Sequence, residues 1–139
     1  MQITRQADYA VRAVLYLAHL GTSERAATST IAEEQRIPPS FLAKIISQLS
    51  IAGLLHTSRG ARGGVTLARE PQDISLLEVI EAIDGPVSLN GCVLWPDECR
   101  RSKGCRMHKA WERAQEQMMA VLDDVTLDKL AAAPQPAVR

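Results

Sequence analysis

Two adjacent prolines constrain the folding of this 139-residue chain more than any other feature. Because proline lacks a backbone N–H and fixes its φ angle, Pro38 ends a preceding helix, whereas Pro39 suits the first turn of the next one. The segment from Thr30 to Glu33 has the form of a capping box that starts the first helix. Apolar residues at helical spacing continue after the prolines as far as Gly53. The sequence therefore predicts two short helices joined by a tight turn.

The segments on either side complete a recognisable unit. Residues 4–20 carry apolar side chains at three- and four-residue steps, which predicts an amphipathic helix that ends at Gly21. Beyond Gly53, short strand-like runs surround a glycine-rich segment that contains Arg59 and Arg62, which predicts a β-hairpin with a basic tip. A helix pair followed by a hairpin is a winged helix-turn-helix, in which the second helix of the pair enters the DNA major groove.

The second half of the chain predicts a different kind of element. Ser75 and Glu78 form a second capping box, which starts a helix that ends near Gly85. A loop over residues 87–104 follows, and then a long helix whose apolar stripe is too large for an exposed face of a monomer. We therefore expect this helix to pair with a second copy in a homodimer. The expected dimerisation residues are Met107, Trp111, Ala114, Met118 and Val121.

The predicted fold class is mainly α-helical with a small β-hairpin, a winged helix-turn-helix followed by a long C-terminal dimerisation helix. We expect a DNA-binding domain over residues 1–84, whose first helix packs at the dimer interface. A loop and dimerisation helix occupy residues 85–133, with a short helix from about residue 126, and residues 134–139 form a disordered tail.

Composition and charge exclude several classes of protein. The content of 46% hydrophobic and 23% charged residues is typical of a globular protein rather than a disordered one. Arg5, Asp8 and Arg12 interrupt the first twenty residues, which leaves no stretch for a signal peptide or a membrane span. We therefore expect a cytoplasmic protein without membrane contact. No catalytic arrangement of side chains is evident, so we expect no enzymatic activity.

The second helix of the pair has an outer face suited to DNA. Its small, polar and cationic residues are Ser40, Ala43, Lys44, Ser47 and Gln48. The Gln48 amide can bind adenine, and Lys44 can reach guanine or a phosphate. Arg59 and Arg62 can enter the minor groove or bind phosphates. Residues 1–70 have eight basic and five acidic side chains, a formal charge of +3, which favours double-stranded DNA as partner over a protein partner or a merely solvated face.

Three cysteines and a histidine form the second candidate site. Cys92, Cys99, Cys105 and His108 have the spacing C-x6-C-x5-C-x2-H. Thiolates bind iron–sulfur clusters or zinc, and imidazole can complete either set, so the spacing alone does not choose the metal. Basic residues near the cysteines would offset the negative charge of a cluster. A thiol switch without metal is the main alternative.

These features together resemble the bacterial iron–sulfur transcription regulators typified by IscR, NsrR and RirA. The likeness extends from Met1 to about Leu130, and its motifs are highly specific in combination. They are Ile3-Thr4, Asp8–Val11, Ile51–Leu55, the wing Arg59–Val65, Ile74–Ile80, the three cysteines and Cys105–Trp111. The resemblance implies a homodimer with paired final helices and a two-fold symmetric operator. It also implies one iron–sulfur cluster per subunit, 2Fe-2S or 4Fe-4S, held by the three cysteines.

The resemblance leaves the fourth ligand open between two residues. In IscR-like members a histidine after the third cysteine corresponds to His108, which we favour because its placement is local. In NsrR-like members an aspartate supplied by the other subunit corresponds to Asp8. The chain departs from the IscR pattern at Ala43, where that pattern has an acidic residue, and in its first cysteine gap, x6 in place of x5.

The functional hypothesis is a DNA-binding transcription regulator, a repressor, whose operator affinity is controlled by an iron–sulfur cluster that senses nitric oxide, iron or redox status. The first alternative is a zinc-bound or cluster-free, thiol-switched regulator of the same fold. The second alternative, a small iron–sulfur electron-transfer protein, would explain the cysteines but not the wing.

Overall fold

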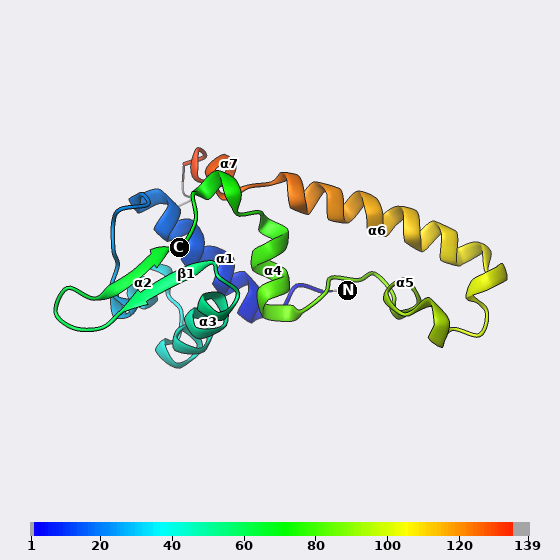
Figure 1. The fold of residues 1–139 in the computed structure, drawn as a ribbon, viewed down its shortest axis with the longest axis horizontal. Coiled ribbons are helices and arrows are strands. Elements are labelled where there is room, and N and C mark those ends of the chain that lie inside the picture. Colours follow the sequence, from blue (N-terminus) through cyan, green and yellow to red (C-terminus); the bar gives the residue numbers. More distant parts are fainter. Residues whose placement is uncertain (1, 135–139) are drawn as a thin grey trace.

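The computed structural model describes residues 2–134, and a group of three helices, on the left of Figure 1, supplies much of its main hydrophobic core. They are α1 (Arg5–Leu20), α2 (Thr28–Gln35) and α3 (Pro39–Ile51). Helix α1 begins as expected, because the Thr4 hydroxyl accepts a hydrogen bond from the Ala7 N–H at 3.1 Å. It ends at Gly21, whose φ of 103° favours glycine. Small and apolar residues on α1 are buried against α2, α3 and the elements that follow.

The helix pair α2–α3 has the predicted turn, but α2 does not begin at the predicted cap. The expected capping box of Thr30 and Glu33 is wrong, because both residues lie inside the helix and the N-cap is Ala27, without a side-chain cap. A tertiary contact fixes this start instead: the preceding residue, Ala26, forms a β-bridge with Val65. The turn runs through Arg36, which adopts the left-handed conformation at φ 51° before the two prolines.

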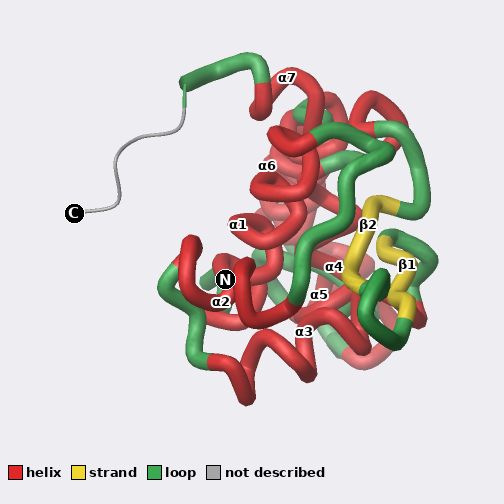
Figure 2. Tube along the Cα trace, turned by 90° about the vertical axis from the view of Figure 1, so that its left-hand side faces the viewer, coloured by secondary structure: helices red, strands yellow, loops and turns green. Residues whose placement is uncertain are grey.

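The predicted hairpin consists of β1 (Leu55–Ser58) and β2 (Gly64–Leu67), which pair antiparallel from Leu55 opposite Leu67 to Ser58 opposite Gly64 (Figure 2). We call residues 55–67 the wing. The side chains of Leu55, Val65 and Leu67 are buried in the main core, so the base of the wing is attached to the helices while its tip is exposed.

Helix α4 (Leu76–Asp84) follows a single 3-10 turn, Pro71–Asp73, and begins at the predicted capping box. The Glu78 N–H donates to the Ser75 hydroxyl at 3.2 Å, and the Ser75 N–H donates to the Glu78 carboxylate at 3.1 Å. Partial burial raises the pKa of Glu78, but hydrogen bonds from Arg69 and from the Ser75 N–H outweigh it and hold the pKa below its ordinary value. The start of α4 is therefore firmly capped.

Residues 86–124, which we call the arm, extend away from the three-helix group and return (Figure 1). The outward half contains α5 (Gly91–Leu94) and the 3-10 turns Pro96–Glu98 and Ser102–Gly104, where we expected an irregular loop. The returning half is the long helix α6 (Arg106–Asp124). Gln115 ties the halves together, because its amide donates to the Val87 carbonyl at 2.6 Å and accepts from the Leu89 N–H at 2.9 Å.

The end of the arm is anchored in the core of the DNA-binding unit. After α6, the short helix α7 (Leu127–Ala131) packs beside α1, and the Leu127 side chain is fully buried. The Leu76 N–H donates to the Val125 carbonyl at 2.8 Å, and the Leu127 N–H donates to the Ile74 carbonyl at 3.0 Å. We call this connection, residues 125–127 against 74–76, the clamp. It joins the arm to the start of α4.

The mainly helical fold with a small hairpin, a winged helix-turn-helix followed by a long C-terminal helix, is confirmed. Among residues 2–134, no helix combines the length and apolar character that crossing a bilayer requires. Apart from Pro134, the tail expected to be disordered lies outside the described residues.

Candidate functional site

The outer face of α3 is positioned by the burial of its opposite face. Leu42, Ile45, Ile46 and Leu49 are buried in the core, which leaves the predicted DNA-reading residues turned outward. Ser40, Ala43, Lys44 and Ser47 are exposed, and Gln48 is half-buried. Most side chains on this face are short, and Lys44 is its one cation. Short side chains allow the helix to approach base edges closely.

Gln48 is the exception on this face, because its side-chain oxygen is buried without a hydrogen-bond partner among the described residues. A buried carbonyl without a donor carries a desolvation cost, and a base-edge donor could relieve that cost once the side chain turns outward. The predicted contact between the Gln48 amide and adenine therefore requires a side-chain rotation.

An aromatic cluster beside α3 escaped the sequence analysis. Phe41 is 47% exposed and packs edge to face on Tyr9 of α1, with ring centroids 6.4 Å apart. The Arg12 guanidinium lies 5.6 Å from the Tyr9 ring centroid and binds the Asp8 carboxylate at 2.6 Å. Tyr9 is 32 positions from Phe41 along the chain, so no local pattern could have predicted that the two rings meet.

The wing presents Arg59 and Arg62 at an exposed tip that contains two glycines, Gly60 with a positive φ and Gly63 with close backbone packing. The Gly63 N–H donates to the Gly60 carbonyl at 2.9 Å, and Gly60 has a φ of 96°. A Cβ at Gly63 would lie 2.3 Å from the Ser58 carbonyl oxygen, so no other residue fits without opening the turn. Neither arginine takes part in an ion pair within the described part of the chain, which leaves both cations available to phosphates.

The three cysteines lie in the arm as free, partly exposed thiols. Cys92 belongs to α5, Cys99 follows the turn Pro96–Glu98, and Cys105 is the N-cap residue of α6. Within residues 2–134, no three His, Cys, Asp or Glu side chains are grouped closely enough to hold a metal ion. The structure therefore places the three thiols in the outer part of the arm but does not bring them together.

His108 is a buried histidine whose two ring nitrogens differ in their surroundings. It is only 8% exposed, and its Nε2 lies 3.1 Å from the Glu112 carboxylate. Its Nδ1 is buried without a hydrogen-bond partner in the described residues. An imidazole nitrogen in this state, one helical turn from Cys105, together with three thiols in the same arm, matches the donor chemistry of an iron–sulfur or zinc centre.

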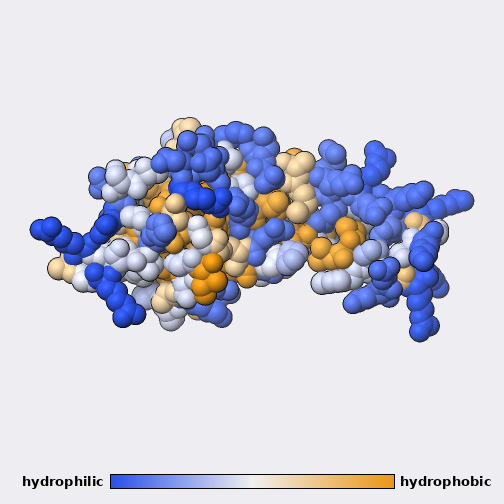
Figure 3. All heavy atoms as spheres, in the orientation of Figure 1, coloured by the Kyte–Doolittle hydropathy of each residue, from blue (hydrophilic) through white to orange (hydrophobic). Residues whose placement is uncertain are grey.

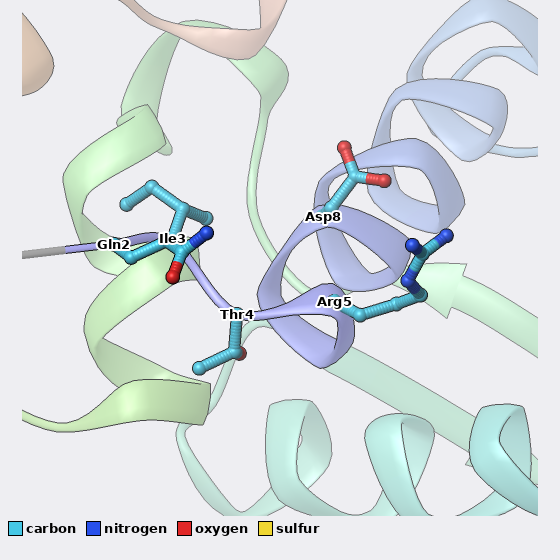
Figure 4. Close-up of a pocket in the computed structure, with 5 residues that line it drawn as sticks. All are labelled: Gln2, Ile3, Thr4, Arg5 and Asp8. Atoms are coloured by element: carbon cyan, nitrogen blue, oxygen red, sulfur yellow. The ribbon is translucent and has the colours of Figure 1, made fainter.

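Asp8, the other candidate for fourth ligand, lies on the first turn of α1. Figure 4 shows it on the same stretch of α1 as Arg5, above the segment that leads into the helix. It lines a surface pocket with Gln2, Ile3, Thr4 and Arg5. Its carboxylate is half exposed and bound to Arg12, so an exchange of partners would be needed for it to coordinate a metal.

The predicted dimerisation stripe on α6 divides into two parts. Met107, Trp111 and Val121 are 64%, 41% and 63% exposed, and Ala114 is exposed as well. Met118 is half-buried, because it packs against the cluster of Leu77, Ile80 and Val87 in its own chain. In Figure 3, hydrophilic residues dominate the outer end of the arm, on the right of the view. The exposed part of the stripe is the part available to a second copy.

This geometry defines a class of protein. A tight-turned helix pair with an exposed polar and cationic face, beside a hairpin with a basic tip, is the winged helix-turn-helix of DNA-binding transcription regulators. Comparison with known proteins gives the family. The chain belongs to the Rrf2 family, whose model is described as an iron-dependent transcriptional regulator and matches residues 3–133.

Three relatives cover nearly the whole chain. An rrf2-like HTH-type transcriptional regulator of Rhodobacter capsulatus is 30% identical over 145 residues, which cover 99% of this chain and 97% of that protein. The structure of CymR, the global cysteine regulator of B. subtilis, has a TM-score of 0.81 and 26% identity, covering 97% of this chain and 99% of that one. The structure of T. potens IscR has a TM-score of 0.75 and 27% identity, with coverages of 98% and 94%.

These comparisons confirm the resemblance to the family of IscR and the class of transcriptional regulator. The expectation that the chain is not an enzyme is confirmed by the same membership. The electron-transfer alternative does not fit a member of a regulator family.

Lys44 provides a direct test of the α3 face. Replacing Lys44 with Ala should weaken operator binding and reduce the slope of log K against log salt concentration by about one unit per subunit, because one cation of each subunit no longer displaces a counterion from a phosphate. Fluorescence anisotropy at several salt concentrations measures both quantities. Lys129→Ala, which removes an equal charge from α7, is the control and should leave the slope unchanged. Unaltered binding by Lys44→Ala would contradict the assignment of α3.

Proposed function

We propose that this chain is a cytoplasmic homodimeric repressor that binds a two-fold symmetric DNA operator, and that an iron–sulfur cluster on Cys92, Cys99 and Cys105 controls its affinity. The observation that carries this proposal is the position of the thiols. All three lie in an arm whose long helix returns to the DNA-binding unit and is anchored there by Leu127. A chemical change at the thiols therefore has a continuous structural path to the reading unit.

The side chains present in each subunit support a cluster that is held by three thiolates and by one further ligand of another kind. Three cysteines in one segment can supply three thiolates, and a bound cluster would supply sensitivity to nitric oxide, iron supply or redox state. His108 is the favoured fourth ligand, because its buried Nδ1 has no hydrogen-bond partner among residues 2–134. The alternative fourth ligand is Asp8 of the partner subunit. The description of the family as iron-dependent supports iron over zinc.

The contact with DNA divides between α3 and the wing. In this proposal, Ser40, Ala43 and Ser47 allow the helix to approach the bases, and Lys44 and Gln48 bind base edges or phosphates. Arg59 and Arg62 bind the minor groove or the flanking phosphates. The two subunits of a homodimer would each place one reading head, its α3 helix and its wing, on one of the two half-sites of an operator.

The α6 helix supports pairing with a second copy. Met107, Trp111 and Val121 are large apolar side chains left exposed on one helix, and covering them removes apolar area from water. We propose that two α6 helices cover each other through this face, with Ala114 allowing close approach and Met118 at its edge. Movement of the paired helices would then change the spacing between the two reading heads.

A thiol-switched or zinc-bound regulator of the same fold is the second candidate. Its thiol-switched form is favoured by the finding that no three potential metal ligands are grouped within residues 2–134. It is also consistent with the likeness to CymR, which is described as a cysteine regulator and whose structure from Staphylococcus aureus includes an oxidized form. In this alternative, a disulfide or zinc at the same cysteines replaces the cluster.

The absorption spectrum of protein purified without oxygen tests the proposal. The native chain should be coloured, and Cys92→Ala, Cys99→Ala and Cys105→Ala should each lose visible absorption, because a cluster with one thiolate fewer is not retained. Ser102→Ala, a change of similar size between the second and third cysteines, should keep the colour. His108→Ala should weaken the cluster if His108 is the fourth ligand.

Metal analysis of the same samples separates the alternatives. Colourless native protein with stoichiometric zinc would show that the cysteines hold a zinc centre instead of a cluster. Colourless, metal-free protein whose DNA affinity changes when the thiols are oxidised would show that the cysteines form a thiol switch. Both outcomes would contradict the iron–sulfur proposal.

A further inference from the structure

We infer that Arg25, which lies outside both the reading helix and the hairpin, is a positioning residue that holds the tip of the wing in the conformation that binds DNA. The inference rests on the proposed DNA-binding function and adds to it a residue that determines how well the wing binds. It is carried by one long-range hydrogen bond, by the backbone pairing next to it and by the composition of the wing tip.

The hydrogen bond joins two segments that are 37 residues apart. Arg25 lies in the connection between α1 and α2, and its Nη1 donates to the main-chain carbonyl of Arg62 at 2.9 Å. A bond from a charged donor is stronger than one between neutral groups. The acceptor belongs to the backbone of a wing arginine, so the bond restrains the tip while the Arg62 guanidinium itself stays available to DNA.

Backbone pairing places Arg25 beside the wing. The Ala26 N–H donates to the Val65 carbonyl at 3.1 Å, and the Val65 N–H donates to the Ala26 carbonyl at 2.8 Å. A Cβ at Gly64 would lie 2.9 Å from the Ala26 carbonyl oxygen and 3.3 Å from the Arg25 Cβ. Ala26 thus acts as a short third strand at the open edge of β2, and this contact directs the Arg25 side chain along the wing.

The tip needs such a restraint because its own contacts are few. Residues 59–62 are exposed, and within the tip one main-chain bond, from the Gly63 N–H to the Gly60 carbonyl, closes the turn. Two glycines in five residues give the free tip many conformations. Ordering it on DNA would cost conformational entropy, and a restraint that orders it beforehand reduces that cost and raises affinity.

Direct contact of Arg25 with a phosphate is the competing role, and it predicts different measurements. A phosphate contact contributes to the salt dependence of binding whatever the wing arginines do. A positioning residue acts through the wing, so its effect should depend on the two wing arginines, Arg59 and Arg62. The dependence of binding on salt and a mutant cycle between Arg25 and the pair Arg59 and Arg62 therefore distinguish the two roles.

Arg25→Ala should weaken binding to the operator about three- to tenfold, which corresponds to ~0.7–1.4 kcal/mol. The slope of log K against log salt concentration should stay unchanged. In a background that carries both Arg59→Ala and Arg62→Ala the same change should have little effect. In the free protein, Arg25→Ala should accelerate hydrogen exchange of the Gly63 amide, which closes the turn of the tip, and leave that of α3 unchanged. Binding isotherms at four salt concentrations and exchange mass spectrometry measure these effects, with Lys129→Ala as the charge-matched control.

The outcomes separate this inference from the proposed function. Wild-type protein that binds no DNA at all would overturn the proposed function. Wild-type binding with unchanged affinity in Arg25→Ala would overturn the inference alone. A loss of affinity that persists when Arg59 and Arg62 are both replaced by Ala, with a slope reduced by about one unit per subunit, would overturn positioning in favour of a phosphate contact. Unchanged exchange at the tip would also contradict the inference.

Discussion

Replacing Met107 and Val121 together with Glu should convert the homodimer to monomers and lower operator affinity by about two to four orders of magnitude. Both side chains are more than 60% exposed on α6, so the substitutions leave the core of the chain intact. In the paired state they would place carboxylates in an apolar, desolvated interface, which is costly without a partner charge. Binding of two linked heads exceeds the binding of one by about 10²–10⁴-fold.

Ala120→Glu is the matched control for this prediction. Ala120 is exposed on the same helix, and adjacent residues are separated by about 100° around the helix axis, so it faces away from Val121. It should leave the mass at twice 15.2 kDa, as light scattering would show for the native protein. A double variant that remains dimeric would contradict the assignment of this face, and a monomer with full operator affinity would contradict the need for pairing.

The elements that the sequence predicted well are those specified by neighbouring residues. The Ser75–Glu78 capping box forms because both partners lie within one helical turn. The hairpin forms because two short strand-like runs lie on either side of a glycine-rich turn. The outward face of α3 followed from the spacing of its buried residues. Each of these signals involves positions a few residues apart, which periodicity can detect.

The features that the sequence did not predict depend on contacts between distant segments. The start of α2 is moved by the bridge between Ala26 and Val65, which overrides the local capping signal at Thr30. The restraint of Arg62 by Arg25 spans 37 residues. Met118 has helical spacing with the exposed stripe, yet it packs on its own chain because α4 lies beside α6. Such contacts are set by the packing of whole elements, which local spacing does not encode.

The candidate metal site shows a third situation. The sequence contains four soft or borderline donors, and the structure places them in one arm. Within residues 2–134 they are not grouped, and in a metal site it is the bonds to the metal that bring such ligands together, which the spacing of the chain does not encode. The unpartnered Nδ1 of His108 could be recognised only once the burial of that side chain was known.

Leu127→Ala should lower the free energy of unfolding by about 2–5 kcal/mol, because a fully buried leucine is replaced by a cavity. The side chain belongs to the main core although it follows the arm in sequence. Chemical denaturation followed by circular dichroism measures the change. Leu130→Ala is the control, because Leu130 lies on the same short helix but is only half-buried. It should lower the free energy of unfolding by less than Leu127→Ala does. A loss below 1 kcal/mol would contradict the anchoring role of Leu127.

The same residue tests how the arm communicates with the reading unit. The clamp is the connection through which α6 continues into the core, with two main-chain hydrogen bonds to residues 74–76. Coupling between sites is typically about 1–3 kcal/mol, or roughly 5–150-fold in affinity. The milder Leu127→Val keeps the core filled more completely and should remain folded, while loosening the clamp.

We expect the ratio of operator affinities between the two states of the cysteine site to fall toward one in Leu127→Val, with the affinity of the DNA-binding unit itself nearly retained. Isotherms for protein with and without its cluster, or with reduced and oxidised thiols, measure that ratio at fixed salt. An unchanged ratio in a variant with a weakened clamp would place the coupling elsewhere, in the contact between α4 and α6. There Met118 and Leu122 pack against Leu77 and Ile80, the other connection between the arm and the core.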